Sequence, residues 1–344
     1  MGCGANRGYA VTPATKYFPD VAKTLPTDLS AKTIAITGTT SGTGYATARF
    51  MLERGATLIM LNRPSSRSTK AEEKLKEEFK ECKVTTVPCD LQSFASVREA
   101  ASKVLELTRE GGLDVLGLNA GIMAMPDNAT KDGCDVQMQT NHLSHFLLTA
   151  LVFPSLEKAA NARGDARVVS MTSLAKSSPN TPAEAKFYGK NGGNLGGDEN
   201  KASLSGPRWE RYHQTKLANC IFTYALADKI EESKYKGKIK AVVAHPGLSA
   251  TNLQITSDKE GSMPGFFGPI FRWLAMSPTD GAAGFVIGCL RDDVANGSLY
   301  GPTSWSGMCG APVLMKPEPL ATTEEVKKML WSESEKSTEC EFKV

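Results

Sequence analysis

Three side chains in this sequence have the types and spacing of an acid–base site. Tyr212 and Lys216 are at positions i and i+4 of a segment with helical periodicity, so they share one helix face. A phenol titrates at about pH 10 in water, and a nearby ammonium group lowers its pKa by favouring the phenolate. Tyr212 is therefore predicted to exchange protons nearer neutral pH. Ser173 follows an apolar run at 166–171, where its hydroxyl can orient a substrate oxygen.

A glycine-rich stretch at 37–44 indicates a binding site for a pyrophosphate. It lies between a β-branched run at 32–38 and a helical pattern. Glycines at such a turn let the backbone approach a phosphate closely, and the helix start presents free N–H groups. The predicted contacts are Gly38, Thr39, Ser41, Gly42, Thr43 and Gly44. Without a ligand, the same pattern forms a tight strand-to-helix turn.

The residues after the second apolar run select the form of the dinucleotide. An acid at this place accepts from the 2′-hydroxyl of the NAD ribose. Here the run at 56–61 ends in Asn62 and Arg63, and an arginine suits a 2′-phosphate instead. The sequence therefore predicts NADP(H) as the cofactor, with Arg67 and Lys70 nearby. The alternative is that Arg63 is a solvated loop cation.

The elements that position these residues alternate between strands and helices. Strands are expected at 32–38, 56–61, 83–88, 113–118, 166–171 and 238–244. Helices are expected at 46–54, 70–80, 93–109, 135–160 and 212–232. Continuous apolar strands that alternate with helices predict a doubly wound α/β fold, with a parallel sheet covered on both faces. Ligands of such folds bind beyond the carboxyl ends of the strands.

Taken in order over residues 32–303, these motifs resemble those of the short-chain dehydrogenase/reductase family. The resemblance implies a Rossmann fold and an oxidoreductase acting on CH–OH or C=O groups with NADP(H). It makes Tyr212 the proton donor or acceptor, and Lys216 a ligand of the nicotinamide ribose that lowers the tyrosine's pKa. It also assigns Ser173 to steadying the substrate and Asn141 to a water relay that reaches Lys216.

The resemblance adds further cofactor contacts after the later strands. Asp90 and Leu91 would lie by the adenine, and a second group would line the cofactor path or contact the nicotinamide and pyrophosphate. This second group comprises Asn119, Ala120, Gly121, Pro246, Gly247, Leu248 and Thr251.

Within the family, residues 140–149 and 277–283 and the His-Pro-Gly turn are similar to retinol dehydrogenases. An apolar stretch at 262–268 suits a lid over a lipophilic small molecule such as a retinoid, a lipid aldehyde or a steroid. The same stretch would also fit peripheral contact with a membrane or with a second copy in a homo-oligomer. An insertion at 176–208 keeps open a C=C reduction like that of protochlorophyllide reductases.

Two other function classes fit the sequence less well. A non-catalytic regulator that senses NADP usually lacks the tyrosine or the lysine, and both are present here. A sugar-nucleotide epimerase typically has a Gly-x-x-Gly-x-x-Gly loop, whereas this loop has Gly38, Gly42 and Gly44.

The composition is that of a globular chain with a sizeable core. Of 344 residues, 41% are hydrophobic and 22% charged, which excludes wholesale disorder. A net charge of +3 speaks against a dedicated nucleic-acid binder, and no apolar run is long enough for a transmembrane helix. The scattered cysteines favour free thiols in the cytoplasm. His142 and His145 lack acidic or cysteine neighbours, so no metal is predicted.

One catalytic domain is expected at 32–303, between an extended N-terminal arm at 1–31 and a C-terminal tail at 304–344. An alternative to a cytoplasmic location is membrane association through acylation at Gly2 and Cys3. Asn6, however, occupies the position where that motif usually has Ser or Thr.

Overall fold

The computed structural model describes residues 13–177, 180–197, 205–250 and 275–344. Gly2, Cys3, Thr251 and the apolar stretch at 262–268 therefore lie outside the described residues. The described residues form an eight-stranded sheet with the order β3-β2-β1-β4-β5-β6-β7-β8, in which β8 alone is antiparallel to its neighbour. The strands are β1 (Thr33–Thr37), β2 (Thr57–Asn62), β3 (Lys83–Pro88), β4 (Val115–Leu118), β5 (Ala166–Met171), β6 (Ile239–Ala244), β7 (Leu299–Gly301) and β8 (Val313–Met315). The predicted doubly wound α/β fold is confirmed.

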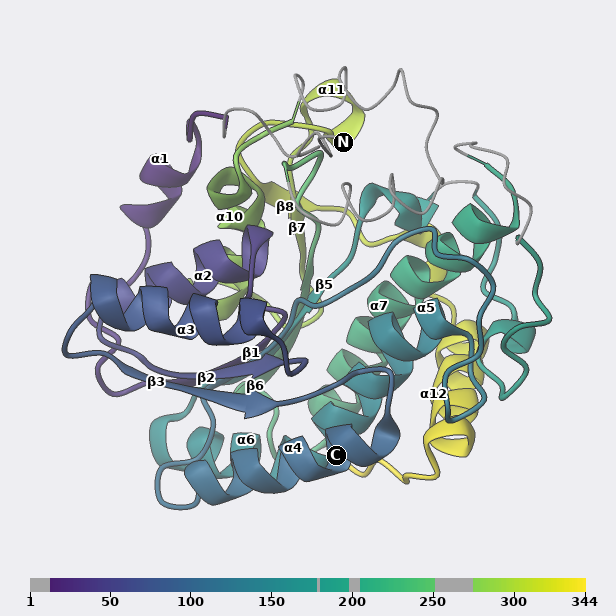
Figure 1. Cartoon of the computed structure of the whole chain (residues 1–344), viewed down its shortest axis with the longest axis horizontal. Helices are drawn as coiled ribbons and strands as arrows, with labels where there is room; N and C mark the ends of the chain where they lie inside the picture. The colour runs from purple at the N-terminus through teal and green to yellow at the C-terminus, as the bar shows by residue number, and fades with distance from the viewer. Residues whose placement is uncertain (1–12, 178–179, 198–204, 251–274) are drawn as a thin grey trace, which may run out of the picture.

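Helices cover both faces of this sheet (Figure 1). One layer contains α1 (Phe18–Ala22), α2 (Gly42–Glu53), α3 (Ser66–Glu78) and α10 (Pro278–Leu290). The other contains α4 (Phe94–Leu107), α6 (Ser144–Arg163), α7 (Pro207–Glu232) and α12 (Glu324–Thr338). Every residue of β4 and β5 is buried, as a parallel sheet between two helical layers requires.

The strand order reverses at β1, which lies between β2 and β4. The connections that leave β1 and β4 run to opposite faces of the sheet, so a crevice opens between them at their carboxyl ends. Thr37 ends β1 and Leu118 ends β4, and the segments that follow them carry the glycine-rich loop and Asn119. The fold thus places the predicted cofactor residues at this crevice.

Two helices that position catalytic candidates differ from the expectation. The helix expected at 135–160 is divided into α5 (Val136–Met138), the π-helical turn η1 (Gln139–Leu143) and α6. The helix expected to begin at Tyr212 begins at Pro207, because proline is favoured in a first turn, where its missing N–H is not needed. Tyr212 therefore lies in the second turn of α7, within the regular part of the helix.

The segment expected to be an extended arm contains α1 and is anchored to the core. Backbone N–H groups of Lys16, Tyr17 and Phe18 donate to the carboxylate of Asp280, at 2.8 to 2.9 Å. The Phe18 ring packs edge-on against Phe50 with a centroid distance of 5.0 Å. Such tertiary contacts order a five-residue helix that would be unstable alone.

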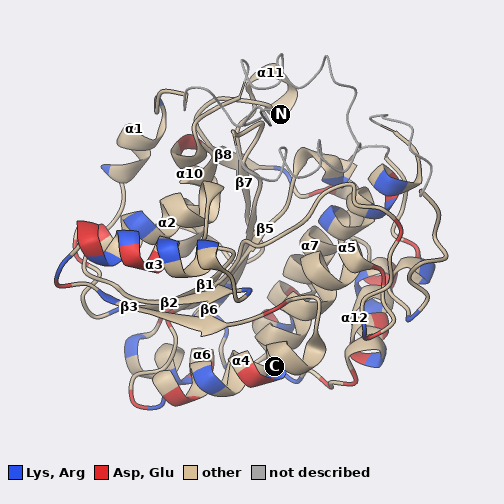
Figure 2. Ribbon diagram, viewed as in Figure 1, with Lys and Arg blue, Asp and Glu red and all other residues tan. Residues whose placement is uncertain are grey.

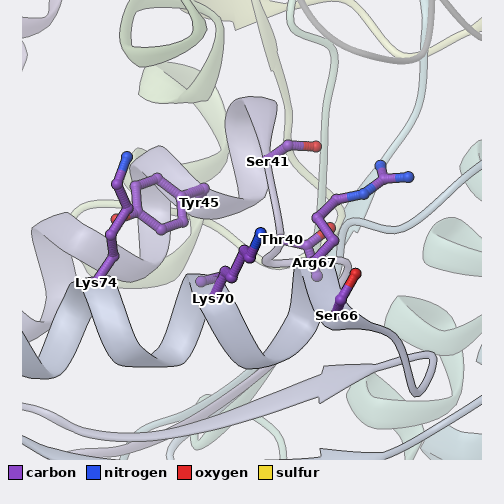
Figure 3. Close-up of a pocket in the computed structure, with 8 residues that line it drawn as sticks. Thr40, Ser41, Tyr45, Ser66, Arg67, Lys70 and Lys74 are labelled. Carbon is purple, nitrogen blue, oxygen red and sulfur yellow. The ribbon is translucent and has the colours of Figure 1, made fainter.

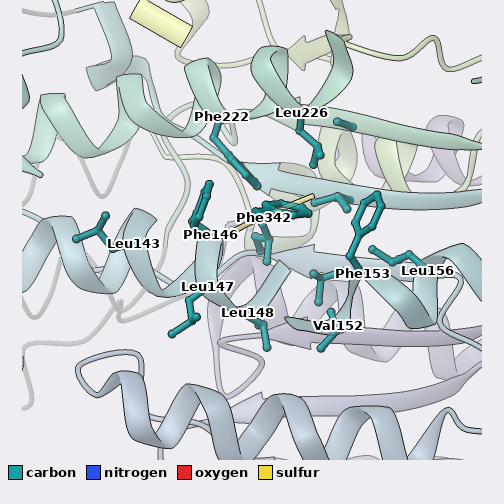
Figure 4. Close-up of a cluster of buried hydrophobic side chains, with 14 of the residues drawn as sticks. Leu143, Phe146, Leu147, Leu148, Val152, Phe153, Leu156, Phe222, Leu226 and Phe342 are labelled. Atoms are coloured by element: carbon teal, nitrogen blue, oxygen red, sulfur yellow. The ribbon is translucent and has the colours of Figure 1, made fainter. Parts of the chain in front are cut away.

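The C-terminal tail is also part of the core. Strand β8 pairs with β7, and α12 packs against α7 (Figure 1). Phe342, beyond α12, packs against Phe146 and Phe153 of α6 at centroid distances of 5.6 and 5.3 Å (Figure 4). The tail therefore completes the apolar layer under the sheet.

Charged side chains of both signs alternate along the outer faces of α3, α4 and α12 (Figure 2). This mixing agrees with the small net charge of the chain. In the described ranges, none of the helices combines the length and apolarity that crossing a bilayer requires.

Candidate active site

The structure brings Tyr212, Ser173 and Lys216 together at the carboxyl end of β5. Ser173 lies two residues beyond this strand, and Tyr212 and Lys216 project from α7. The Ser173 side chain lies near enough to the Tyr212 hydroxyl to lower the pKa of the phenol. The Lys216 ammonium group donates to the carbonyl of Met171 at 3.2 Å and lies 5.8 Å from the centroid of the Tyr212 ring. A serine, a tyrosine and a lysine from two elements thus share one site.

Burial changes the proton affinities of this group. It raises the pKa of Tyr212 to about 12, although the neighbouring Ser173 side chain acts in the opposite direction. Burial also lowers the pKa of Lys216 to about 8. The expectation that the ammonium group lowers the tyrosine's pKa considered only charge, whereas desolvation is larger here. At neutral pH the site therefore holds a protonated phenol beside an ammonium group.

Asn141 lies in the π-helical turn and joins two parts of the site. Its side-chain amide donates to the carbonyl of Ile122 and to Thr215 Oγ1, both at 2.9 Å, and its oxygen accepts from the Ile122 N–H at 2.8 Å. A Cβ atom added to Gly121 would lie 3.2 Å from Asn141 Oδ1 and 3.3 Å from Lys216 Nζ. Asn141 therefore connects the segment after β4 to α7, close to the lysine. Single π turns recur at functional sites in helices.

The glycine-rich loop is packed closely against the segment after β4. A Cβ atom on Gly44 would lie 2.3 Å from the Gly38 carbonyl oxygen and 2.4 Å from Asn119 Nδ2. Asn119 donates to that carbonyl at 3.2 Å, and Thr43 Oγ1 donates to Asn119 Oδ1 at 2.9 Å. Ala120 lies against Gly38, which has a φ of 72°. This loop at a helix start fits the pyrophosphate of a dinucleotide.

Asn62 is a site residue that the search for an acid after β2 missed. Its side-chain oxygen accepts from the Thr39 N–H at 2.8 Å, and its amide donates to Thr39 Oγ1 at 2.9 Å. Asn62 is buried and ends β2 directly after four apolar residues, 58–61. A single amide at the end of an apolar run was the signal in the sequence that could have identified Asn62, because a buried amide needs a hydrogen-bond partner.

A pocket of about 490 Å³ lies between the glycine-rich loop and α3 (Figure 3). Thr40 and Ser41 form its loop side, and Arg67, Lys70 and Lys74 line its α3 side. Ser66, Tyr45 and Ala71 complete the lining. The lining carries three cations and no carboxylate, which suits an anion such as a phosphate monoester.

These cations also lack competing partners within the described residues. The acids Glu72 and Glu78 of α3 pair with Lys76 and Arg49, and Arg67 and Lys70 belong to no ion pair there. Arg63, which the sequence placed against the 2′-phosphate, is exposed and does not line the pocket. Arg67 and Lys70 are exposed as well, but they line the pocket beside the loop.

The other predicted residues lie at the same edge of the sheet. Asp90 follows β3, and its carboxylate accepts from the Gln92 N–H at 3.0 Å, while Leu91 is buried. After β6, Leu248 exchanges backbone hydrogen bonds with Met308 and Met276. Pro246 and Gly247 precede it, and Gly247 has a φ of 61°.

The two histidines considered as metal ligands have hydrogen-bond partners instead. His142 Nε2 lies 2.8 Å from Ser334 Oγ, and His145 Nε2 lies 3.0 Å from Thr37 Oγ1. Over the ranges that the structure covers, no group of His, Cys, Asp and Glu is arranged to hold a metal ion.

Comparisons with known proteins identify the family of the chain. A family model described as short chain dehydrogenase matches residues 32–187. Human retinol dehydrogenase 14 is 31% identical, over 89% of this chain and 86% of its own length. An uncharacterized oxidoreductase of Schizosaccharomyces pombe is 30% identical, over 80% and 76%. The crystal structure of an uncharacterized protein from Mycobacterium paratuberculosis superposes with a TM-score of 0.69 at 29% identity, covering 97% of this chain and 100% of that one.

Replacing Asn62 with Ala should weaken dinucleotide binding. The change leaves the Thr39 N–H without its partner, so we expect a loss of roughly 1–3 kcal/mol in stability and roughly 10-fold in affinity. Titration of the protein with NADPH, followed by fluorescence, measures the affinity. Asn161 of α6 is exposed, and Asn161→Ala is the control that should bind normally. Unchanged binding by Asn62→Ala would show that the loop holds its shape without this side chain.

Proposed function

Because the chain belongs to the short-chain dehydrogenase family, we propose that Tyr212, Ser173, Lys216 and Asn141 form the active site of an NADPH-dependent carbonyl reductase. Membership makes the chain an oxidoreductase that interconverts CH–OH and C=O groups with a nicotinamide cofactor, and within the family it is retinol dehydrogenase-like. The observation that carries the proposal is the meeting of Ser173 with Tyr212 and Lys216.

The protonation states of the site favour carbonyl reduction at neutral pH. A bound nicotinamide supplies the hydride that goes to the carbonyl carbon. Tyr212, whose pKa is about 12, carries the proton that the carbonyl oxygen needs, so the phenol is the acid. The Ser173 hydroxyl donates a hydrogen bond to the same oxygen and orients it. After proton transfer, the Lys216 ammonium group stabilises the phenolate.

The pocket beside the glycine-rich loop supports a preference for the phosphorylated dinucleotide. The 2′-phosphate of the adenosine carries charge that Arg67 and Lys70 can pair with, and Thr40 and Ser41 add hydroxyl donors. Asn62 takes the place of the acid that would otherwise accept from a free 2′-hydroxyl. We therefore assign the selection of NADPH mainly to Arg67 and Lys70, with Arg63 as the competing candidate.

The residues around Tyr212 favour a lipophilic substrate. Trp209, one turn earlier on α7, is half-buried and lies edge-on to the Tyr212 ring at a centroid distance of 6.0 Å. A large aromatic face beside the reacting phenol suits an apolar molecule. The relatives named retinol dehydrogenases make retinoids and other lipid aldehydes the first substrates to test. Contact with a membrane, contact with a second copy and the cellular location stay predictions from the sequence.

Purified protein should reduce at least one lipophilic aldehyde with NADPH. A panel of retinal, medium-chain aldehydes and steroid ketones, followed by NADPH absorbance, tests the reaction. Tyr212→Phe removes the proton donor but keeps the ring, so we expect kcat to fall by roughly 10²–10⁴-fold with NADPH binding unchanged. Normal NADPH binding without turnover of any carbonyl would contradict the proposal and favour a regulator. Turnover of a conjugated C=C bond alone would favour the protochlorophyllide reductase-like alternative.

The rate of reduction should fall as the pH rises above about 8. Lys216 has a lowered pKa of about 8, so its charge is present below that pH and is lost above it. Tyr212 stays protonated throughout this range because its pKa is about 12. In a profile of kcat/KM, Lys216→Arg should be slower but should lack this alkaline decline, since an arginine stays charged. If the decline persisted in Lys216→Arg, another group would be responsible.

Loss of Arg67 and Lys70 should reduce the preference for NADPH over NADH. Each charge-assisted contact contributes roughly 1.5–3 kcal/mol, so we expect each single Ser variant to lower the ratio of the two efficiencies by at least roughly 10-fold. Arg63→Ser, at the exposed residue that follows β2, is the matched comparison. A larger effect of Arg63→Ser than of Arg67→Ser would show that Arg63, the residue predicted from the sequence, binds the 2′-phosphate.

A further inference from the structure

We propose that the C-terminal segment, residues 313–344, positions the turns that carry Ser173 and Asn141. The matched family model ends at residue 187, so this segment lies outside it. Two of its buried side chains each bond to a residue that lies within three positions of a catalytic candidate. The inference rests on the proposed function, because that function assigns Ser173 and Asn141 to the active site.

The first contact holds the turn that follows Ser173. This turn is the 3₁₀ helix η2 (Leu174–Ser177), and Lys176 Nζ donates to Glu318 Oε2 at 2.9 Å. Ser177 Oγ donates to the same oxygen at 2.8 Å. The Lys176 and Glu318 side chains are 8% and 5% exposed, so this ion pair is inside the protein. The Glu318 N–H donates to the Tyr224 hydroxyl at 3.1 Å, which attaches the pair to α7.

The second contact holds the π-helical turn that carries Asn141. The next residue, His142, is buried, and its Nε2 lies 2.8 Å from Ser334 Oγ of α12. The other ring nitrogen of His142 has no hydrogen-bond partner in the described part of the chain. The ring is also enclosed by Tyr188 and Phe222, at centroid distances of 5.7 and 5.9 Å. Ser334 therefore supplies the polar contact that fixes this ring.

These contacts matter because catalysis depends on small distances. Ser173 must stay beside Tyr212 while it binds the substrate oxygen, and Asn141 must keep its bonds to Ile122 and Thr215. A displacement of about 1 Å can cost roughly 100-fold in rate. Glu318 and Ser334 act through Lys176 and His142, so they are positioning residues.

Two other contacts of the same segment bond to neither η2 nor η1 and serve as comparisons. Glu339 pairs with Lys190 on the surface at 2.5 Å, with 73% and 46% of the two side chains exposed. Ser337 Oγ, buried on α12, donates to the Tyr188 carbonyl at 2.7 Å. Ser337 thus matches Ser334, because both are buried serines of α12 whose hydroxyl makes a hydrogen bond. Glu339 matches Glu318, because both are carboxylates of the C-terminal segment that pair with a lysine of the insertion at 176–208.

The first experiment separates positioning from stability at the buried ion pair. In the full-length protein, Lys176→Met with Glu318→Leu replaces both charges by apolar groups, which often leaves folding stability unchanged. We expect a melting temperature near that of the original chain, KM and NADPH affinity within roughly 2-fold, and kcat lowered by roughly 10-fold. Glu339→Gln should leave all four quantities unchanged. Full kcat in a stable double variant would overturn the role of Glu318.

The second experiment compares the two serines of α12. Ser334→Ala should lower kcat by roughly 5- to 10-fold, whereas Ser337→Ala should keep kcat despite a similar loss of stability. Ser334→Thr retains a hydroxyl and should restore most of the rate. Equal kcat values for the two alanine variants at matched stability would overturn the role of Ser334.

Failure of the inference about the C-terminal segment can be distinguished from failure of the proposed function. If the original chain reduces no carbonyl while it binds NADPH, the proposed function is wrong. If it is active, Tyr212→Phe is inactive, and the Glu318 and Ser334 variants keep full kcat, only the inference about the C-terminal segment is wrong.

Discussion

The sheet is covered by helices on both faces, and this constraint decides where functional groups can lie. One apolar cluster joins the sheet to α4, α6, α7 and α12, and the other joins it to α1, α2, α3 and α10. Polar side chains inside these layers would need partners that an apolar core does not supply. The segments that follow the strands lie outside these apolar layers, so their polar groups can face a ligand. The glycine-rich loop, Asn119, Ser173 and the turn after β6 all lie in such segments.

The site combines buried charge with fully bonded polar groups. Lys216 and Tyr212 are about as buried as the core, and burial moves the pKa of each toward its neutral form. The amides of Asn62, Asn119 and Asn141 each use both ends of the side chain to join neighbouring segments. These bonds offset the cost of burying the amides and connect the neighbouring segments to one another.

Segments outside the matched family model also bond to the folded core. The N-terminal segment attaches to α10 through Asp280, and the C-terminal segment reaches the turns after β5 and within η1. Trp331 stacks between Phe222 and Phe342, at centroid distances of 6.1 and 5.0 Å, and so fills the space between α7 and the end of the chain. Both of these segments are therefore parts of the folded core.

The sequence alone determined the fold class and the family, and it named the candidate site residues. Strand and helix periodicities are local, and the spacings of Gly38 to Gly44 and of Tyr212 to Lys216 each lie within one element or turn. The roles assigned to these residues stay predictions, but their meeting at one edge follows from the parallel strands.

Only the tertiary structure decided the rest. It showed that Arg67 and Lys70 line the pocket while Arg63 does not, that Asn62 bonds to Thr39, and that Tyr212 has a raised pKa. It also placed Glu318 against Lys176, across 142 residues of chain. Desolvation and long-range contacts depend on which surfaces are brought together by packing, and no local pattern of residue types records that.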